Sequence, residues 1–128
     1  MGLFSKSKKT KEEKIENQVP WHILSDITQL EEIKELSKSM PVAIFKHSTR
    51  CGISRMVLRQ FESTYSLKDE QLKLYYLDLL TYRNISDEIG FTFQVLHQSP
   101  QLIVIKDGVA IAHAAHHDIQ ADSLENYI

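Results

Sequence analysis

Cys51 is the residue of this 128-residue chain that is best suited to do chemistry. An apolar run over residues 42–46 precedes it, and a helical pattern begins near Gly52 directly after it. We therefore expect Cys51 at the N-terminus of a helix, where unpaired backbone N–H groups and the helix dipole stabilise a thiolate. Arg50 supplies an adjacent cation, and the Ser54 hydroxyl lies one helical turn further on, where it can hydrogen-bond the sulfur. The pattern favours a nucleophilic cysteine over the buried, inert role that many free cysteines have.

The cysteine count limits what this site can be. Because Cys51 is the single cysteine, no intramolecular disulfide and no multi-cysteine zinc or iron–sulfur site can form within one chain. His113, His116 and His117 look like a metal-binding cluster at first sight. On a strand, however, residues 113 and 116 face opposite sides, and adjacent residues also diverge. We therefore expect no metal site.

Hydrophobic periodicity predicts the elements that hold Cys51 in place. The expected strands are apolar or alternating segments: 21–24, 42–46, 72–79, 102–105 and 109–112, the last two joined by a turn at Asp107-Gly108. Four helices are expected. The first runs from a cap at Ser25 or Asp26 to about residue 39, and the second begins at Gly52, with Met56, Val57, Leu58 and Phe61 spaced for burial. The third covers 84–89 with Gly90 as its C-cap, and the fourth covers 119–127 with Asp118 as its N-cap. This order predicts an α/β fold, with a central mixed sheet of four to five strands flanked by helices.

Composition and charge narrow the class of protein. The chain carries 15 Lys+Arg against 17 Asp+Glu, a formal net charge of −2, so it lacks the basic character of most nucleic-acid-binding proteins. No apolar run approaches the ~20 residues that span a bilayer, so no membrane partner is expected. Residues 1–18 are polar, which predicts a flexible arm ahead of one domain over 19–128. The first residues lack the apolar core of a secretory signal, so we expect a reduced, cytoplasmic setting.

Cys51-Gly-Ile-Ser54, between a strand and a helix, resembles the active site of the thioredoxin superfamily. Ser54 stands where dithiol members have a second cysteine, so the resemblance is to the monothiol form. Ser99-Pro100 adds to it, because thioredoxin-like folds place a cis proline facing the active-site cysteine, just before a strand. A cis Pro100 would leave the backbone of Ser99 free to pair with a substrate's extended chain. The resemblance implies a thioredoxin-like fold.

A longer pattern resembles the YtxJ-type monothiol bacilliredoxin family over residues 20–128. Its parts are His47-Ser-Thr-Arg-Cys-Gly-Ile-Ser-Arg, Val95-Leu-His-Gln-Ser-Pro-Gln, Asp107-Gly108 and His116-x-x-Ile119. This resemblance implies removal of bacillithiol, a low-molecular-weight thiol, from S-bacillithiolated proteins. It implies no tightly bound cofactor, with bacillithiol as co-substrate and with S-thiolated proteins and a recycling reductase as partners.

The same resemblance implies roles for individual residues. Cys51 would be the catalytic nucleophile, Pro100 the cis proline and His97 a residue close to the site. His97 would orient the substrate or supply positive charge near its carboxylates, and a structural, hydrogen-bonded histidine is the alternative. Family members commonly have proline where this chain has Gly52, which brings the motif nearer to the Cys-Gly-Phe-Ser glutaredoxins.

Two other functions are open at this stage. One is a monothiol glutaredoxin-like protein that handles glutathione or carries a [2Fe–2S] cluster across a dimer, since such a cluster needs four ligands. Against it, Gly108 stands alone where glutathione-using glutaredoxins have a Gly-Gly-x-Asp-type segment. The other is a non-catalytic thioredoxin-fold module that binds peptides along the edge at Pro100.

Overall fold

Five strands form one mixed sheet in the computed structural model, which describes residues 19–128. They lie in the order β1-β3-β2-β4-β5 and are β1 (Trp21–Ile23), β2 (Val42–His47), β3 (Lys73–Asp78), β4 (Gln101–Lys106) and β5 (Val109–Ala115). The first three strands of this order are parallel, whereas β4 is antiparallel to β2 and to β5. The predicted α/β fold with a mixed sheet is confirmed. The arm predicted over 1–18 lies outside the described residues.

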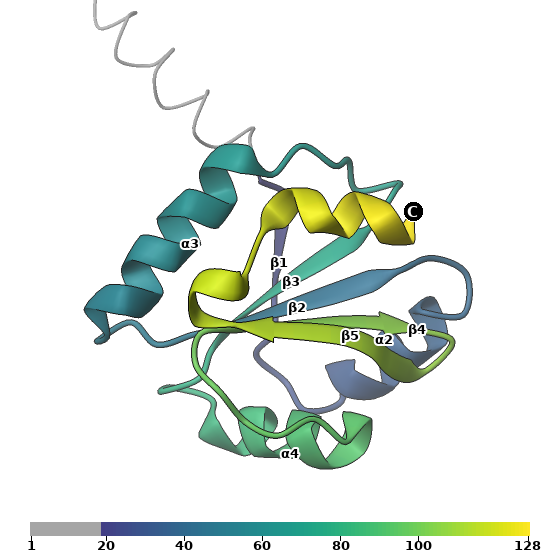
Figure 1. Cartoon of the computed structure of the whole chain (residues 1–128). Coiled ribbons are helices and arrows are strands. Elements are labelled where there is room, and N and C mark those ends of the chain that lie inside the picture. Colours follow the sequence, from purple (N-terminus) through teal and green to yellow (C-terminus); the bar gives the residue numbers. More distant parts are fainter. Residues whose placement is uncertain (1–18) are drawn as a thin grey trace, which may run out of the picture.

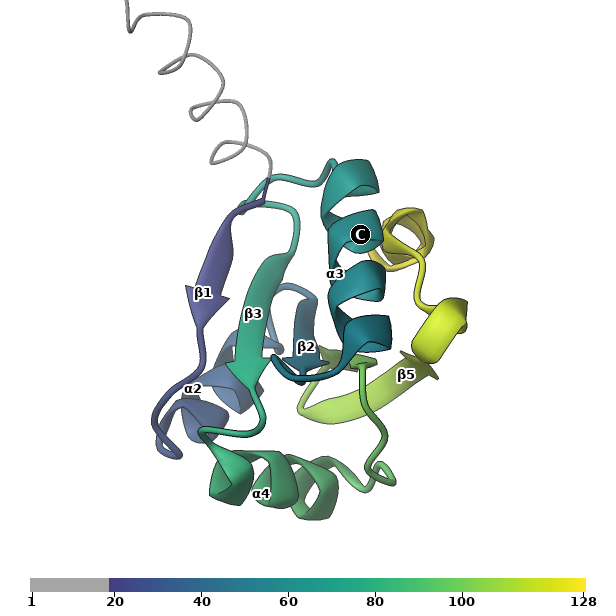
Figure 2. The ribbon, with the colours of Figure 1, turned by 90° about the vertical axis from the view of Figure 1, so that its left-hand side faces the viewer.

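Helices cover both faces of the sheet (Figure 1). One face carries α2 (Gln29–Leu36) and α4 (Arg83–Phe93). The other carries α3 (Gly52–Thr64) and two 3₁₀ segments, η1 (His116–Asp118) and η2 (Ala121–Tyr127). Figure 2 shows the arrowheads of β1, β2 and β3 pointing toward α4 and the start of α3. Ligand sites in open α/β sheets lie beyond the carboxyl ends of the parallel strands. We call this end of the sheet the active-site edge.

Strand β2 is central, and all six of its residues are buried. Its side chains alternate between the faces, so Ile44 joins the core under α2 and α4, and Phe45 joins the core under α3. The same alternation continues into the polar end of the strand. It places Lys46 on the α4 face of the sheet and His47 on the α3 face.

Helix α4 is longer than the segment predicted over 84–89. It continues to Phe93 and ends at Gln94, whose left-handed conformation has a φ of 58°. Gly90 is therefore an interior residue and not the predicted C-cap. A Cβ at Gly90 would lie 3.1 Å from the carbonyl oxygen of Val95, so the glycine lets the chain after the helix return close to it. Phe93 is buried on the same side of the helix as Ile89, and the predicted helix ended before it.

Two other local predictions need correction, and a third is confirmed. The C-terminal segment forms 3₁₀ turns instead of an α-helix, and Asp118 belongs to the first of these turns and makes no capping bond. Met56 is 47% exposed, because the buried stripe of α3 follows Val57 and Phe61 instead. The cap predicted at Asp26 is confirmed, although regular α2 begins only at Gln29: the Asp26 side chain accepts a hydrogen bond from Thr28 N–H at 2.9 Å, and the Gln29 side chain accepts one from Asp26 N–H at 2.9 Å.

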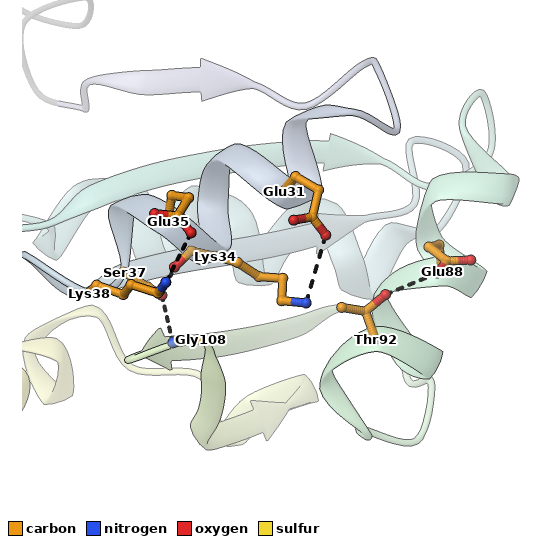
Figure 3. A network of polar contacts seen from close by, with 8 residues as sticks. All are labelled: Glu31, Lys34, Glu35, Ser37, Lys38, Glu88, Thr92 and Gly108. Atoms are coloured by element: carbon orange, nitrogen blue, oxygen red, sulfur yellow. Dashed lines mark hydrogen bonds and ion pairs between the residues drawn. The ribbon is translucent and has the colours of Figure 1, made fainter.

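A tight turn joins β4 to β5 at the edge opposite the carboxyl ends of the parallel strands. Asp107 and Gly108 both have positive φ angles, 53° and 81°, as a two-residue hairpin turn requires. Ser37, at the end of α2, holds this turn (Figure 3). Its hydroxyl oxygen accepts a hydrogen bond from Gly108 N–H at 2.8 Å, and its carbonyl accepts one from Asp107 N–H at 2.8 Å. The β4–β5 hairpin is thereby fixed to the helical layer.

Candidate active site

Cys51 occupies the N-cap position of α3, at the junction with the chain leaving β2. Its backbone is extended (φ −104°, ψ 125°), and its carbonyl accepts the first helical hydrogen bond, from Arg55 N–H at 3.0 Å. Its side chain is a free thiol and is partly exposed. At this position the sulfur lies at the end of the helix where backbone N–H groups lack intrahelical acceptors, and these groups favour negative charge.

Ser54 holds the first turn of α3 against β2. The sequence led us to expect its hydroxyl on the sulfur of Cys51. Instead, its oxygen lies 2.8 Å from Nδ1 of His47 and accepts a hydrogen bond from Ser48 N–H at 3.1 Å. Ser54 is fully buried, and burial lowers the pKa of His47, which favours the neutral ring beside this hydroxyl. Ser54 therefore positions the loop that carries Cys51, through the end of β2.

Two arginines flank the thiol, and the structure gives them different surroundings. Arg50, the expected cation, is exposed in the turn before Cys51. Arg55 folds back along the loop, because its Nη1 donates to the carbonyl of Thr49 at 3.3 Å. Its Nη2 lies 3.9 Å from the place where a Cβ on Gly52 would stand. The guanidinium of Arg55 therefore contacts Thr49, which precedes Cys51, and lies near Gly52, which follows it. Sequence reasoning missed Arg55, although its spacing of one helical turn from the cysteine could have indicated it.

The loop before β4 reaches the same edge as Cys51. β4 runs antiparallel to β2, with Gln101 opposite Lys46, so the start of β4 lies beside the end of β2. The Ser99–Pro100 peptide bond is cis, as the resemblance implied. Pro100 is buried and Ser99 partly exposed. The topology therefore brings the proline loop and the cysteine loop, about 50 residues apart in the chain, to one edge of the sheet.

His97 lies in this loop and is exposed. Gln101 holds the backbone on both sides of it: its Nε2 donates to the carbonyl of Leu96 at 2.9 Å, and its Oε1 accepts from Gln98 N–H at 3.3 Å. Burial and the charge of Lys46 lower the pKa of His97. This direction disfavours the positive charge that was one of the two expected substrate-binding roles of His97.

The three remaining histidines that the sequence brought to attention do not form a cluster. His113 is exposed on β5, and His116 and His117 lie in η1. Within residues 19–128, no group of three histidine, cysteine, aspartate or glutamate side chains is placed to hold a metal ion. In the same residues, no helix is long and apolar enough to cross a membrane.

Comparisons with known proteins agree with this arrangement. Residues 22–124 match the family described as monothiol bacilliredoxin BrxC. A solved structure with a thioredoxin fold, provisionally described as an oxidoreductase, is 32% identical, with a TM-score of 0.70 over 84% of this chain and 92% of that chain. Thioredoxin of Malassezia sympodialis is 18% identical (TM-score 0.65; 86% and 88% covered), and thioredoxin of Trypanosoma brucei brucei is 17% identical (TM-score 0.62; 87% and 89% covered). The last two establish the fold alone.

Proposed function

The chain belongs to the monothiol bacilliredoxin family, and from this we propose that it removes bacillithiol from S-bacillithiolated proteins. The family and the thioredoxin fold make it a thiol redox enzyme in general terms. One observation carries the more specific proposal: the single cysteine of the chain is a partly exposed free thiol at the N-terminus of α3. A nucleophile so placed can exchange with a disulfide but has no second cysteine with which to resolve the product.

The first step is a disulfide exchange. The Cys51 thiolate attacks the bacillithiol sulfur of a protein–bacillithiol mixed disulfide. A bond forms between the Cys51 sulfur and the bacillithiol sulfur, and the bond to the target protein's sulfur breaks. The electron pair of the broken bond leaves with the target cysteine, which is released as a thiolate and takes a proton from water. The target protein is thereby reduced, and Cys51 becomes S-bacillithiolated.

The second step needs another thiol, because Cys51 is the only cysteine in the sequence. A free bacillithiol thiolate attacks the bacillithiol sulfur on Cys51, which yields bacillithiol disulfide and restores the Cys51 thiolate. Reduction of that disulfide falls to a separate reductase partner. Such a cycle requires a reducing compartment, and the cytoplasm is the setting we propose.

Residues around Cys51 have supporting roles in this proposal. Arg50 and Arg55 would supply positive charge to the loop that carries Cys51. Gly52 leaves the start of α3 open, since beyond its chain neighbours a Cβ there would meet only the guanidinium of Arg55 at 3.9 Å. Ser99 and Pro100 line the edge along which the target chain would lie.

Intact-mass spectrometry tests the proposal. Reduced protein is mixed with an S-bacillithiolated substrate and, in parallel, with an S-glutathionylated one, and the Cys51→Ser variant serves as control. The expected result is a gain of one bacillithiol on Cys51, with the substrate released reduced and no gain on the variant. Transfer of glutathione alone would indicate a glutaredoxin-like activity instead, and visible absorbance of the purified protein would indicate a cluster carrier. Transfer of neither thiol would favour a peptide-binding module.

A further inference from the structure

His47 ends β2 and anchors the loop that leads to Cys51. Its backbone is fixed to the chain leaving β3, because its carbonyl accepts a hydrogen bond from Leu79 N–H at 3.0 Å. The side chain is 4% exposed, and Nδ1 of its ring lies 2.8 Å from the hydroxyl oxygen of Ser54. Ser54 has no exposed surface. Both partners of this contact are therefore shielded from water.

Two further hydrogen bonds connect this contact to the backbone of Cys51. The Ser54 oxygen accepts one from Ser48 N–H at 3.1 Å, and the carbonyl of Ser48 accepts one from Cys51 N–H at 3.2 Å. Ser48 is therefore held on one side by the buried hydroxyl and on the other side by the cysteine. The position of Cys51 at the start of α3 depends on the contact between His47 and Ser54.

The hydroxyl of Ser54 has a single hydrogen, and this determines the direction of its bond to His47. If the ring donated from Nδ1, the Ser54 oxygen would accept from both His47 and Ser48, and its own hydrogen would be left over. Within residues 19–128 the Ser54 hydroxyl makes no other hydrogen bond, and a buried donor without an acceptor is costly. All donors and acceptors match when the hydroxyl donates to an unprotonated Nδ1, with the ring hydrogen on Nε2.

From this geometry we infer that His47 is a positioning residue for exchange at Cys51, and that it holds the cysteine loop as the neutral ring with its hydrogen on Nε2. The inference rests on the proposed function and adds control by a proton to it. A proton taken up by the ring goes to Nδ1, which then donates to the Ser54 oxygen. The hydroxyl hydrogen of Ser54 thereby loses its acceptor. The buried anchor is then mismatched, the loop that carries Cys51 is held less firmly, and exchange slows.

The groups that face the ring favour its neutral form. Burial is the largest influence on the pKa of His47 and lowers it, the Asp78 carboxylate opposite it on β3 raises it, and the Arg55 guanidinium on α3 lowers it. The Tyr76 ring lies 5.7 Å from the imidazole and is a neutral phenol, since burial raises its pKa. The anchor is therefore complete at neutral pH and is lost on the acid side of the ordinary histidine pKa of about 6.5. Cys51 also titrates on this loop, so its ionisation has to be measured separately.

The rate of exchange at Cys51 as a function of pH tests this role. The probe is hydroxyethyl disulfide, which carries no titrating group, and its reaction with Cys51 is followed by intact mass from about pH 5 to about pH 8. Each rate is divided by the fraction of Cys51 that is thiolate, which the ultraviolet absorbance of the thiolate gives with Cys51→Ser as blank. We expect the rate per thiolate to fall about fivefold on the acid side, as the loss of one buried hydrogen bond allows.

Two variants assign the fall to His47. His47→Phe keeps a ring but has no acceptor, so it should show the low rate at every pH. His47→Asn places an amide oxygen that does not titrate near the position of Nδ1, so it should restore most of the rate and remove the fall. His113→Asn is the matched control, since His113 is exposed on β5, and it should keep the full pH profile.

A flat profile in the unmodified protein, a fall that persists in His47→Asn, or an unchanged rate in His47→Phe would overturn the inference. Nitrogen NMR of the unmodified protein reports the tautomer of His47 even if both variants fail to fold, and a hydrogen on Nδ1 at neutral pH would contradict the anchor. The same protein is also mixed with an S-bacillithiolated substrate. If Cys51 takes no bacillithiol while the profile with hydroxyethyl disulfide is as expected, the proposed function fails and the role of His47 stands.

Discussion

Replacing Lys46 by methionine should stabilise the protein. The folded protein holds this ammonium without a hydrogen-bond partner, and burial lowers its pKa from 10.5 to about 8. Keeping the proton at pH 7 therefore costs the folded state up to about 3 kcal/mol relative to the unfolded chain. Methionine has a similar length and no charge, so the variant should recover much of that free energy of unfolding.

The sign of the pH dependence follows from the two pKa values of Lys46. Between about pH 8 and 10.5 the unfolded chain binds the proton and the folded protein does not, so stability should rise with pH in this window. Below pH 8 both states are protonated, and the full cost is present. Tyr65, Tyr75 and Tyr76 have raised pKa values and act in the opposite direction above pH 10, equally in protein and variant.

Urea unfolding of the protein, Lys46→Met and the control Lys106→Met, at pH 7 and at pH 9.5, measures these differences. The advantage of Lys46→Met should be largest at pH 7 and should shrink at pH 9.5, while Lys106→Met should show no such change. A Lys46→Met variant that is less stable than the unmodified protein at pH 7 would refute the reasoning. It would mean that the ammonium has partners, such as ordered water, that compensate its burial.

Three further changes test the site and the fold. Cys51→Ser should abolish transfer of the small thiol in the intact-mass assay, and full activity in this variant would contradict the mechanism. Arg50→Ala removes an exposed charge and should slow the transfer no more than about fivefold. Ser54→Ala leaves the buried His47 ring and the partly buried Ser48 N–H unpaired, and it should lower the free energy of unfolding by about 2 kcal/mol in urea titrations. The control Ser63→Ala, at an exposed serine of the same helix, should cost less than about 0.5 kcal/mol. Equal losses would show that the Ser54 bonds do not hold the loop. Gly108→Ala should lower the free energy of unfolding by about 1 kcal/mol in thermal unfolding. No atom lies within 4 Å of the added Cβ, so the positive φ alone causes this loss. An unchanged unfolding midpoint would argue against that turn geometry.

Local patterns in the sequence predicted much of the fold. The apolar run at 42–46 predicted the central strand, and the polar break after it predicted that a helix begins at Gly52. These features are local, because burial on both faces requires a continuous apolar segment and a helix start requires a break in it. Where the sequence prediction failed, as at Gly90, the deciding contact was with the Val95 carbonyl beyond the helix end, which no periodicity contains.

The sequence by itself determined that the chain has one thiol and that this thiol lies between a strand and a helix, since both facts depend on residue type and neighbours alone. Tertiary structure decided what surrounds it. The hydroxyl of Ser54 turned to His47 and not to the sulfur, because burial required the histidine ring to find a partner. The antiparallel register placed the buried Lys46 opposite Gln101, whose side chain holds the backbone beside His97, and that register is set by packing across the whole sheet.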